Sequence, residues 1–357
     1  MGKTKNIGDY IQILATRQFY NHIDGFIEKE DLSHFQSKGG DKVKAIVNGW
    51  FMWKPENWPP SEDIVPLFIS IHFSPLIIKD ILLKKDYLKQ HSPIGCRDLT
   101  TLYELRRSGI ESYFSGCITL TLGKSYHFEG RRKGICFVDP YFPIPSRKEL
   151  SFINSIKLLL CFVNNVNKIL YLSRNNFFKN YGKLWGYESV IPGIKGTIKS
   201  ILKATCFYMT YHTYFSDRVI MSSDYILHIV PVSKDNPLSH DDWLKKADNY
   251  LQKYMKAELV VTSRIHAALP CLAMETPVIF MNSESLNSNK IEFNTPGRLE
   301  GIIDFFRTMT IKEFSISTCD EILKAYTKID TNIVFKNKDN WREYAKRISE
   351  ICIGFMK

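Results

Sequence analysis

The chain has 357 residues, of which 44% are hydrophobic and 24% are charged, and it carries a formal net charge of +11. This composition excludes an intrinsically disordered protein, and the length allows two domains that each have their own core. No apolar run reaches the roughly 18 to 20 residues that a membrane-spanning helix needs, and the first residues lack the apolar core of a signal peptide.

The eight cysteines stand far apart, mostly within apolar runs, and none forms a C-x-x-C pair. We therefore expect buried thiols rather than disulfides or zinc ligands, and a cytoplasmic protein. The positive net charge indicates an acidic partner. Because the basic residues form no nucleic-acid recognition motif, we expect an anionic small substrate or an anionic membrane surface instead.

The first predicted element is a turn that leads into a helix, in residues 6–20 (NIGDYIQILATRQFY). Ile11 and Leu14 recur at helical spacing, and Asp9 has the side chain of a helix cap. Gly8 allows the backbone to approach a ligand closely. From the residues alone, a plain cap and a functional role explain Asp9 equally well.

Two strands are expected next, at residues 45–51 (AIVNGWF) and 67–73 (LFISIHF), with a proline-rich loop between them. The first strand ends at Asn48 and Gly49, beside Trp50, and the second ends close to His72. A histidine in this position is more often a core residue than a catalyst.

Residues 93–122 indicate a strand, a turn, a helix and a second strand. Arg97 falls in the turn and Asp98 has the side chain of a helix N-cap. Arg97 could simply pair with Asp98, or it could contact a ligand. Its place in a strand-to-helix turn favours the ligand.

The stretch at residues 258–281 (ELVVTSRIHAALPCLAMETPVIFM) predicts a buried strand, a helix and another buried strand. Thr262 and Ser263 are helix-cap residue types, and the turn also carries Arg264 and His266. In an open α/β sheet, ligands bind at the carboxyl ends of the strands, and a helix N-terminus attracts anions. From the residues alone, an anion site and a solvated helix cap explain Arg264 and His266 equally well.

The other expected elements are less distinctive. They are a polar linker at 123–133, a strand ending at Asp139, helices between 146 and 172, a poorly periodic region at 173–220, a strand at 224–230 containing His228, an amphipathic helix at 241–254, a polar loop at 283–298, a helix starting at 299–306 and a last helix at 340–356.

Four of these segments resemble the polysaccharide pyruvyl transferase family. They are NIGDYIQILATRQFY, AIVNGWFMW, SPIGCRDLTTLYELRRSGIESYFSGCITLTL and VVTSRIHAALPCLAMETPVIFM, which occur in the expected order over residues 6–282. Two features depart from the family pattern. Ala267 follows His266 where many relatives have glycine, and Pro270 lies inside the predicted helix.

The resemblance implies an α/β fold with two Rossmann-like domains that face a cleft, a GT-B-like architecture. We expect an N-terminal domain for the acceptor at residues 1–128 and a C-terminal domain for the donor at 129–339. A final helix at 340–357 is expected to pack back across the hinge.

The resemblance also implies the reaction. Pyruvate would move from phosphoenolpyruvate, as co-substrate, onto two hydroxyls of a sugar, forming a ketal. The acceptor would belong to a surface polysaccharide, such as a capsular one, or to its lipid-linked precursor, which allows peripheral contact with the inner face of the membrane. No other cofactor is expected, and no metal-ligand motif is visible in the sequence.

The expected roles follow from this chemistry. His266 and Asp9 are the expected catalytic acid and base. Donor-binding residues are Arg264, Arg97, Ser263 and His266, and acceptor-binding residues are Asn6, Gly8, Asn48, Trp50 and His72. Two alternatives remain at this point: a nucleotide-sugar glycosyltransferase of the GT-B type, and a carbohydrate- or nucleic-acid-binding module without catalysis.

Overall fold

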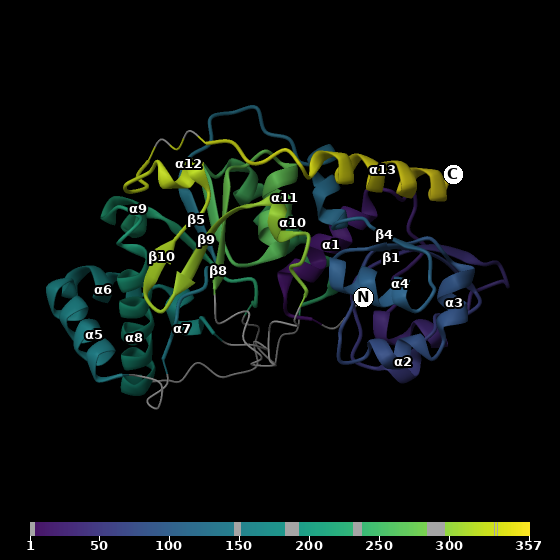
Figure 1. Cartoon of the computed structure of the whole chain (residues 1–357), viewed down its shortest axis with the longest axis horizontal. Helices are drawn as coiled ribbons and strands as arrows, with labels where there is room; N and C mark the ends of the chain where they lie inside the picture. The colour runs from purple at the N-terminus through teal and green to yellow at the C-terminus, as the bar shows by residue number, and fades with distance from the viewer. Residues whose placement is uncertain are drawn as a thin grey trace.

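The structure is a computed structural model that describes residues 4–145, 151–182, 193–230, 238–283, 297–331, 333 and 335–357. It confirms the predicted α/β class with parallel sheets (Figure 1). Over the described residues, one sheet has the strand order β1-β2-β3-β4 and the other has the order β10-β9-β8-β7-β5-β6. No helix of these residues is both long and apolar enough to cross a membrane.

The first sheet is parallel throughout its described strands, β1 (Val43–Phe51), β2 (Ile64–Phe73), β3 (Ile94–Cys96) and β4 (Ser112–Phe114). The register between β1 and β2 slips between Val47 and Gly49. Opposite the slip, Ser70 has a φ of 56° and its N–H donates to Ser115 Oγ at 3.1 Å. This bulge shifts the pairing register of the last residues of β2, which include His72.

The helices around the first sheet are short. They are α2 (Ile78–Leu82), α3 (Lys85–Gln90) and α4 (Leu99–Arg107), with 3₁₀ turns η1 (Lys29–His34) and η2 (Pro55–Asn57). Asp98 caps α4, as predicted, because its carboxylate accepts the Thr101 N–H at 2.9 Å.

The second sheet is parallel except at β10, which pairs with β9 in antiparallel fashion. Its strands are β5 (Ile135–Val138), β6 (Asp224–Ile226), β7 (Leu259–Thr262), β8 (Val278–Ser283), β9 (Arg307–Lys312) and β10 (Ser315–Ser317). Successive side chains enter different cores: Val260 belongs to one apolar cluster, whereas Leu259 and Val261 belong to another. Burial of both faces explains the continuous apolar runs seen in the sequence.

Different groups of helices cover the two faces of this sheet. The first cluster includes residues of α10 (His240–Lys256) and α11 (Ile265–Ala273). The second cluster includes residues of α5 (Phe152–Asn164), α6 (Val166–Ser173), α7 (Asn176–Asn180), α8 (Gly193–Tyr211), α9 (Asp217–Ser222) and α12 (Glu321–Lys324). The poorly periodic region therefore contains helices that cover one face of the sheet.

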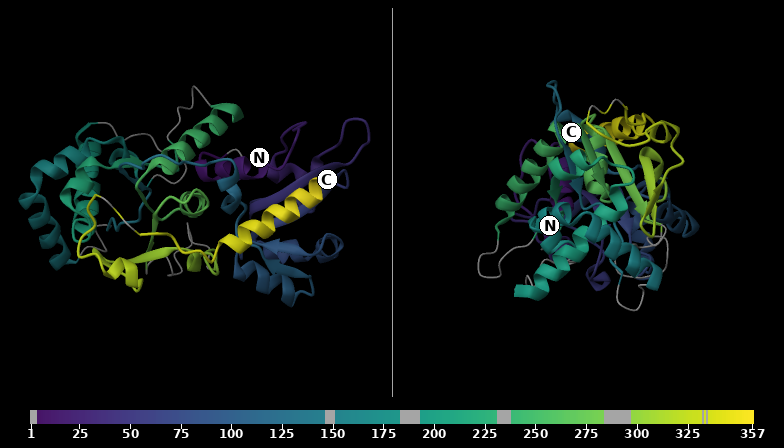
Figure 2. Two further views of the ribbon diagram at one scale, coloured as in Figure 1. Left: turned by 90° about the horizontal axis from the view of Figure 1, so that it is seen from above. Right: turned by 90° about the vertical axis from the view of Figure 1, so that its left-hand side faces the viewer.

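Helices α1 and α13 link the parts of the chain that carry the two sheets. Helix α1 (Ile7–Arg17) contacts β1 and also α10, α11 and the 3₁₀ helix η3 (Ile118–Lys124). The Ile7 N–H donates to the His228 carbonyl at 2.9 Å, which places the start of α1 at the second sheet. The last helix, α13 (Arg342–Met356), contacts β2 and η3 and runs out over the N-terminal half of the chain (Figure 2). The proposed domain boundaries remain predictions.

Several local expectations were wrong. Asn6, not Asp9, caps α1, because its side chain accepts the Gly8 N–H. Arg264 occupies the N-cap position of α11, while the Thr262 hydroxyl accepts the Arg264 N–H at 2.9 Å.

Three expected boundaries also shift. β6 ends at Ile226 and leaves His228 outside the strand, the predicted linker begins inside η3, and residues 299–306 form turns and the 3₁₀ turn η5 (Ile303–Phe305) instead of an α-helix. Most of the predicted polar loop at 283–298 and the start of the helices at 146 lie outside the described residues.

The cysteine prediction is confirmed. All eight are free thiols, and six of them are buried. Cys161 is partly exposed and Cys319 is exposed.

Gly123 tests the contact between η3 and α11. A Cβ at this position would lie 2.3 Å from the Ala273 carbonyl oxygen, so we expect Gly123→Ala to lower the free energy of unfolding by about 1–3 kcal/mol. Urea denaturation measures this loss. The control is Gly354→Ala on α13, where nothing lies within 4 Å of the new Cβ. It should leave stability unchanged or raise it by up to about 1 kcal/mol. Equal stability of both variants would contradict the close packing of η3 on α11.

Candidate active site

The start of α11 lies against the start of α1, at the carboxyl end of the second sheet. A Cβ at position 8 would lie only 3.1 Å from both Cβ and Nδ1 of His266, so glycine permits this approach. His266 is buried in the first turn of α11, immediately after β7. The two segments singled out in the sequence, at the start of α1 and after β7, are therefore in contact.

An ion pair holds Arg264 at this edge of the sheet. Its Nε donates to Asp139 Oδ2 at 3.0 Å, and the same oxygen accepts the His228 N–H at 3.0 Å. Asp139 follows β5, is buried and has a φ of 40°, which is a strained conformation for a residue other than glycine. Among the described residues, neither terminal nitrogen of Arg264 has a hydrogen-bond partner, so both can bind a ligand.

Arg97 is the least compensated charge in the described protein. Its side chain is fully buried, yet none of its three guanidinium nitrogens has a hydrogen-bond partner among the described residues. Asp98 Oδ2 lies 3.9 Å from Arg97 Nε, but this carboxylate is engaged by His72 and by the Thr101 N–H. Simple pairing with Asp98 therefore does not account for Arg97. A buried cation without partners is costly, and an anion would satisfy it.

Arg298 adds a third guanidinium, which the sequence analysis did not name. Burial and the positive charge of Arg97 lower its pKa to about 10, and its Nε has no partner among the described residues. The segment that carries it docks on α4: the Leu99 N–H donates to the Glu300 carbonyl at 3.2 Å, and a Cβ on Gly297 would overlap Thr100. The only sequence signal was a Pro-Gly turn before an arginine, which is weak evidence.

Two buried histidines complete the cluster. His72 Nδ1 lies 2.6 Å from Asp98 Oδ2, but burial outweighs this bond and lowers the pKa of His72 to about 4. Burial, followed by the charges of Arg97 and Arg298, lowers the pKa of His266 well below its usual value. Both rings are therefore neutral at pH 7. The Nε2 atom of each has no hydrogen-bond partner among the described residues.

The cluster thus joins residues from both sheets. Arg97 and Arg298 act electrostatically on both His72 and His266, and Asp9 and Arg264 act on Arg298. The structure brings together most of the predicted donor and catalytic residues. Among the described residues, no three His, Cys, Asp or Glu side chains form a group that could hold a metal ion.

Other predicted residues already have partners within the protein. The Ser263 hydroxyl accepts the Tyr141 N–H at 2.8 Å and donates to the Met281 carbonyl at 2.6 Å. The Ser263 hydroxyl therefore links the segments that follow β5 and β7 to strand β8. A role in donor binding remains a prediction.

The acceptor residues predicted on β1 contact different elements. Asn48 Nδ2 donates to Thr16 Oγ1 on α1 at 2.7 Å. The Trp50 ring lies 4.5 Å from the Trp53 ring and 4.9 Å from Lys29 Nζ. A role in acceptor binding stays a prediction for both residues.

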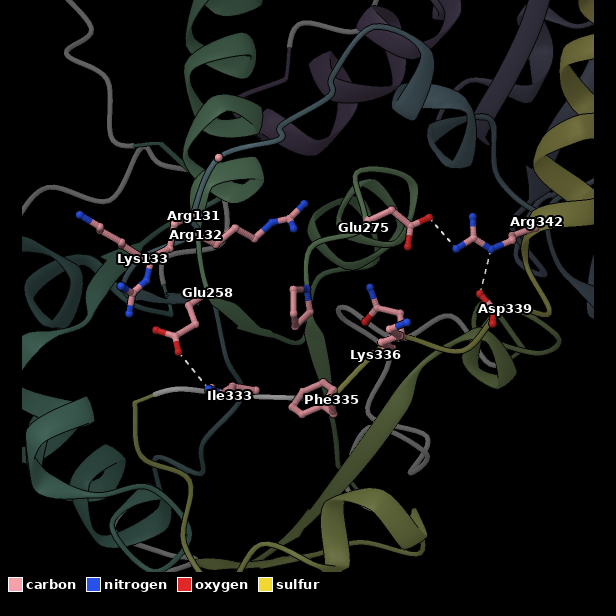
Figure 3. Close-up of a pocket in the computed structure, with 14 residues that line it drawn as sticks. Arg131, Arg132, Lys133, Glu258, Glu275, Ile333, Phe335, Lys336, Asp339 and Arg342 are labelled. Carbon is pink, nitrogen blue, oxygen red and sulfur yellow. Dashed lines mark hydrogen bonds and ion pairs between the residues drawn. The ribbon is translucent and has the colours of Figure 1, made fainter.

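A separate hollow of about 990 Å³ lies at the opposite, amino ends of β5, β7 and β8 (Figure 3). Several of its charges are compensated: Arg342 bonds Glu275 at 2.7 Å and Asp339 at 2.8 Å, and Glu258 accepts the Ile333 N–H at 2.9 Å. The buried charges without hydrogen-bond partners among the described residues lie at the arginine cluster, which is why we place the candidate active site there.

Fold and site define an α/β protein with a cluster of arginines and buried histidines near the contact between the start of α11 and the start of α1. Residues 6–285 match the family model of polysaccharide pyruvyl transferases, so the chain belongs to this family. No curated protein and no solved structure matches the chain.

We expect replacement of Arg97 by methionine to remove anion binding without lowering the free energy of unfolding. Without an anion, Arg97→Met should be as stable as the wild type or up to about 4 kcal/mol more stable, because an apolar side chain replaces a buried cation that has no hydrogen bonds from its side chain among the described residues. It should also lose the stabilisation that inorganic phosphate gives the wild type. Urea denaturation with and without phosphate measures both effects.

The control for this experiment is Arg107→Met. Arg107 lies on the same helix, α4, with an 81% exposed side chain, and should behave as the wild type. A loss of more than about 3 kcal/mol in Arg97→Met would instead show that Arg97 is satisfied by the protein itself.

The buried neutral histidines predict a loss of stability in acid. The folded-state pKa of His72 and of His266 is below the unfolded value of about 6.5, so the unfolded chain binds more protons between these values. The stabilisation is present above about pH 6.5 and decreases as the pH falls towards the folded-state pKa of each ring, about 4 for His72, by up to about 1.4 kcal/mol per pH unit for each histidine. Melting temperatures from pH 8 to pH 5 measure this slope.

Substitution of single histidines shows which of them causes the pH dependence of stability. His266→Gln should reduce the pH dependence by the contribution of one histidine, whereas His127→Gln, at a 75% exposed side chain, should leave it unchanged. An unchanged slope in His266→Gln would mean that this ring is not held neutral in the folded protein.

Proposed function

We propose that this chain transfers pyruvate from phosphoenolpyruvate onto two hydroxyls of a sugar, forming a cyclic ketal. The observation that carries the proposal is the buried Arg97, which lacks hydrogen-bond partners among the described residues and lies in electrostatic contact with Arg298 and His266. Membership of the polysaccharide pyruvyl transferase family supports the same chemistry and implies a saccharide acceptor.

The donor fits the charge of the cluster. Phosphoenolpyruvate carries a phosphate and a carboxylate, and separated guanidinium groups can grip these with paired charge-assisted hydrogen bonds. In this proposal Arg97, Arg298 and the free terminal nitrogens of Arg264 bind the two anionic groups. The Asp139 ion pair orients Arg264 for this role.

The reaction needs one proton at the donor's methylene carbon and two proton acceptors for the attacking hydroxyls. Protonation of the methylene makes the second carbon cation-like, and the first hydroxyl then adds there and loses its proton. The C–O bond to phosphate breaks, inorganic phosphate leaves, and the second hydroxyl adds and loses its proton to close the ketal. One of the released protons restores the acid and the other is taken up by a base, by phosphate or by solvent.

His266 is the proposed acid, and binding of the donor enables it to act as one. In the ligand-free protein, the neighbouring arginines help to keep this ring neutral. A bound anion offsets their charge and raises the pKa of His266, so the ring takes up a proton as the donor arrives.

Asp9 and His72 are the proposed bases. Asp98 accepts from Nδ1 of His72 in a 2.6 Å contact, which leaves Nε2 as the acceptor of a hydroxyl proton.

The acceptor side of the proposal rests on the elements of the first half. Asn6, Gly8, Asn48, Trp50 and His72 are the proposed acceptor contacts, with Trp50 as a sugar-stacking face. We further propose that residues 1–128 and 129–339 act as two GT-B-like domains facing a cleft. An acceptor in a surface polysaccharide, or its lipid-linked precursor, would place the reaction in the cytoplasm or at the inner face of the membrane.

Thermal stabilisation by candidate donors tests the proposal. We expect phosphoenolpyruvate, at about 100 times its dissociation constant, to stabilise the wild type by about 2.7 kcal/mol and to have little effect on Arg264→Ala. Arg107→Ala serves as the matched control and should respond as the wild type does. Release of inorganic phosphate that depends on a saccharide acceptor would complete the test.

A different donor would overturn the proposal. If nucleotide-sugars stabilise the wild type and phosphoenolpyruvate does not, the chain is a glycosyltransferase that grips a diphosphate with the same arginines. Donor binding without turnover of any saccharide would instead indicate a binding module.

A further inference from the structure

Helix α5 exposes an apolar stripe to solvent. Its members recur at helical spacing on one face, and two of them, Phe152 and Leu159, are 80% and 61% exposed. The stripe consists of Phe152, Ile153, Ile156, Leu159, Leu160 and Val163. The opposite side of the helix faces the protein, since Leu158 is buried in the second cluster and Phe162 packs against it. Apolar surface thus remains after the core is complete.

Helix α8, which contacts α5, carries a second exposed apolar row. Ile194, Ile198 and Leu202 stand four residues apart and are exposed, Ile194 at 80%. The same helix buries Ala204 and Phe207 in the core and contacts both α5 and α6. These helices lie together at the end of the molecule farthest from the first sheet (Figure 1). We call the exposed residues of both helices the α5–α8 face.

The charged residues of helices α5 to α8 have one sign, although Lys168 of α6 pairs with Asp217 of α9 at 2.6 Å. Between residues 151 and 216, the described residues include seven lysines and arginines and no aspartate or glutamate. Lys157 on α5 and Lys195 and Lys199 on α8 are exposed beside the apolar positions. Large exposed apolar patches mark interaction sites, and exposed lysines flank the apolar positions of this one.

We propose that the α5–α8 face docks onto an anionic lipid bilayer. Helices that lie in the plane of a membrane interface combine an apolar face with flanking lysines. The apolar side chains enter the acyl boundary while the lysine stems reach back to the headgroups, where anionic lipids attract them.

A second copy of the chain fits this face less well. Two copies would bring two clusters of lysines together without an acidic residue between them among the described residues of these helices. Lysine is also depleted in the cores of protein interfaces. Charge complementarity therefore favours lipid over a copy of the same chain.

Docking involves no chemistry at the arginine cluster, so it stands independently of the proposed pyruvyl transfer. If that reaction takes place on a lipid-carried saccharide, the face would also hold the chain where the acceptor is.

Co-sedimentation of the full chain with sucrose-loaded vesicles tests the proposal. We expect binding to vesicles of phosphatidylcholine mixed with phosphatidylglycerol, and much weaker binding to phosphatidylcholine alone or at high salt. The double variant Leu159→Gln, Leu160→Gln should lower the partition coefficient about tenfold or more, because it removes apolar surface from the bilayer contact. The variant Lys195→Gln, Lys199→Gln should lower it for the anionic vesicles only.

The control is Leu83→Gln, which removes an equally apolar side chain, 80% exposed, near the first sheet and should bind vesicles as the wild type does. Light scattering on the same samples reports oligomeric state. The proposal is overturned if the wild type stays in the supernatant with both vesicle types, or if the leucine double variant binds as the wild type does. A wild-type dimer that the double variant dissociates, with no vesicle binding, would assign the face to a second copy.

Discussion

The uncompensated charge of Arg97 is the constraint on which the rest of the site depends. A buried guanidinium is stable only when interactions with its surroundings compensate for the hydration energy that it loses. The side-chain nitrogens of Arg97 have no hydrogen-bond partner among the described residues. Arg97 and Arg264 also repel Arg298, because the three charges have the same sign. Such a cluster lowers the stability of the ligand-free protein, and binding of an anionic ligand would restore it.

Contacts between the two halves of the chain hold this unfavourable arrangement in place. The start of α1 bonds to the backbone beyond β6, and the segment after Gly297 docks on α4 through the Glu300 carbonyl. Asp139 accepts a strained backbone conformation and bonds both Arg264 and the His228 N–H. Each contact bridges segments more than 80 residues apart, so the geometry of the cluster is a property of the assembled fold.

The same electrostatic field links donor binding to protonation. The arginines that would bind an anion also help to hold His266 neutral, so the ring and the ligand respond to the same charges. In the proposed reaction, this coupling delays protonation of the acid until the donor has arrived. The bond to Asp98 fixes the orientation of His72, while burial keeps its ring neutral, and this pair offers a fixed acceptor nitrogen beside the same arginines.

The sequence by itself determined the local features: the α/β class, the strand-to-helix turns that carry Arg97 and Arg264, the cap at Asp98 and the buried thiols. Periodicity, capping side chains and apolar runs act over a few residues, and the family motifs occur in these same segments. Only the tertiary structure decided that Arg298 joins the cluster, that Asp139 holds Arg264, and that His72 pairs with Asp98. It also decided that His266 is neutral, because burial and the charges of residues distant in sequence set its pKa. Those properties depend on distance and solvent access, and neither is a function of position along the chain.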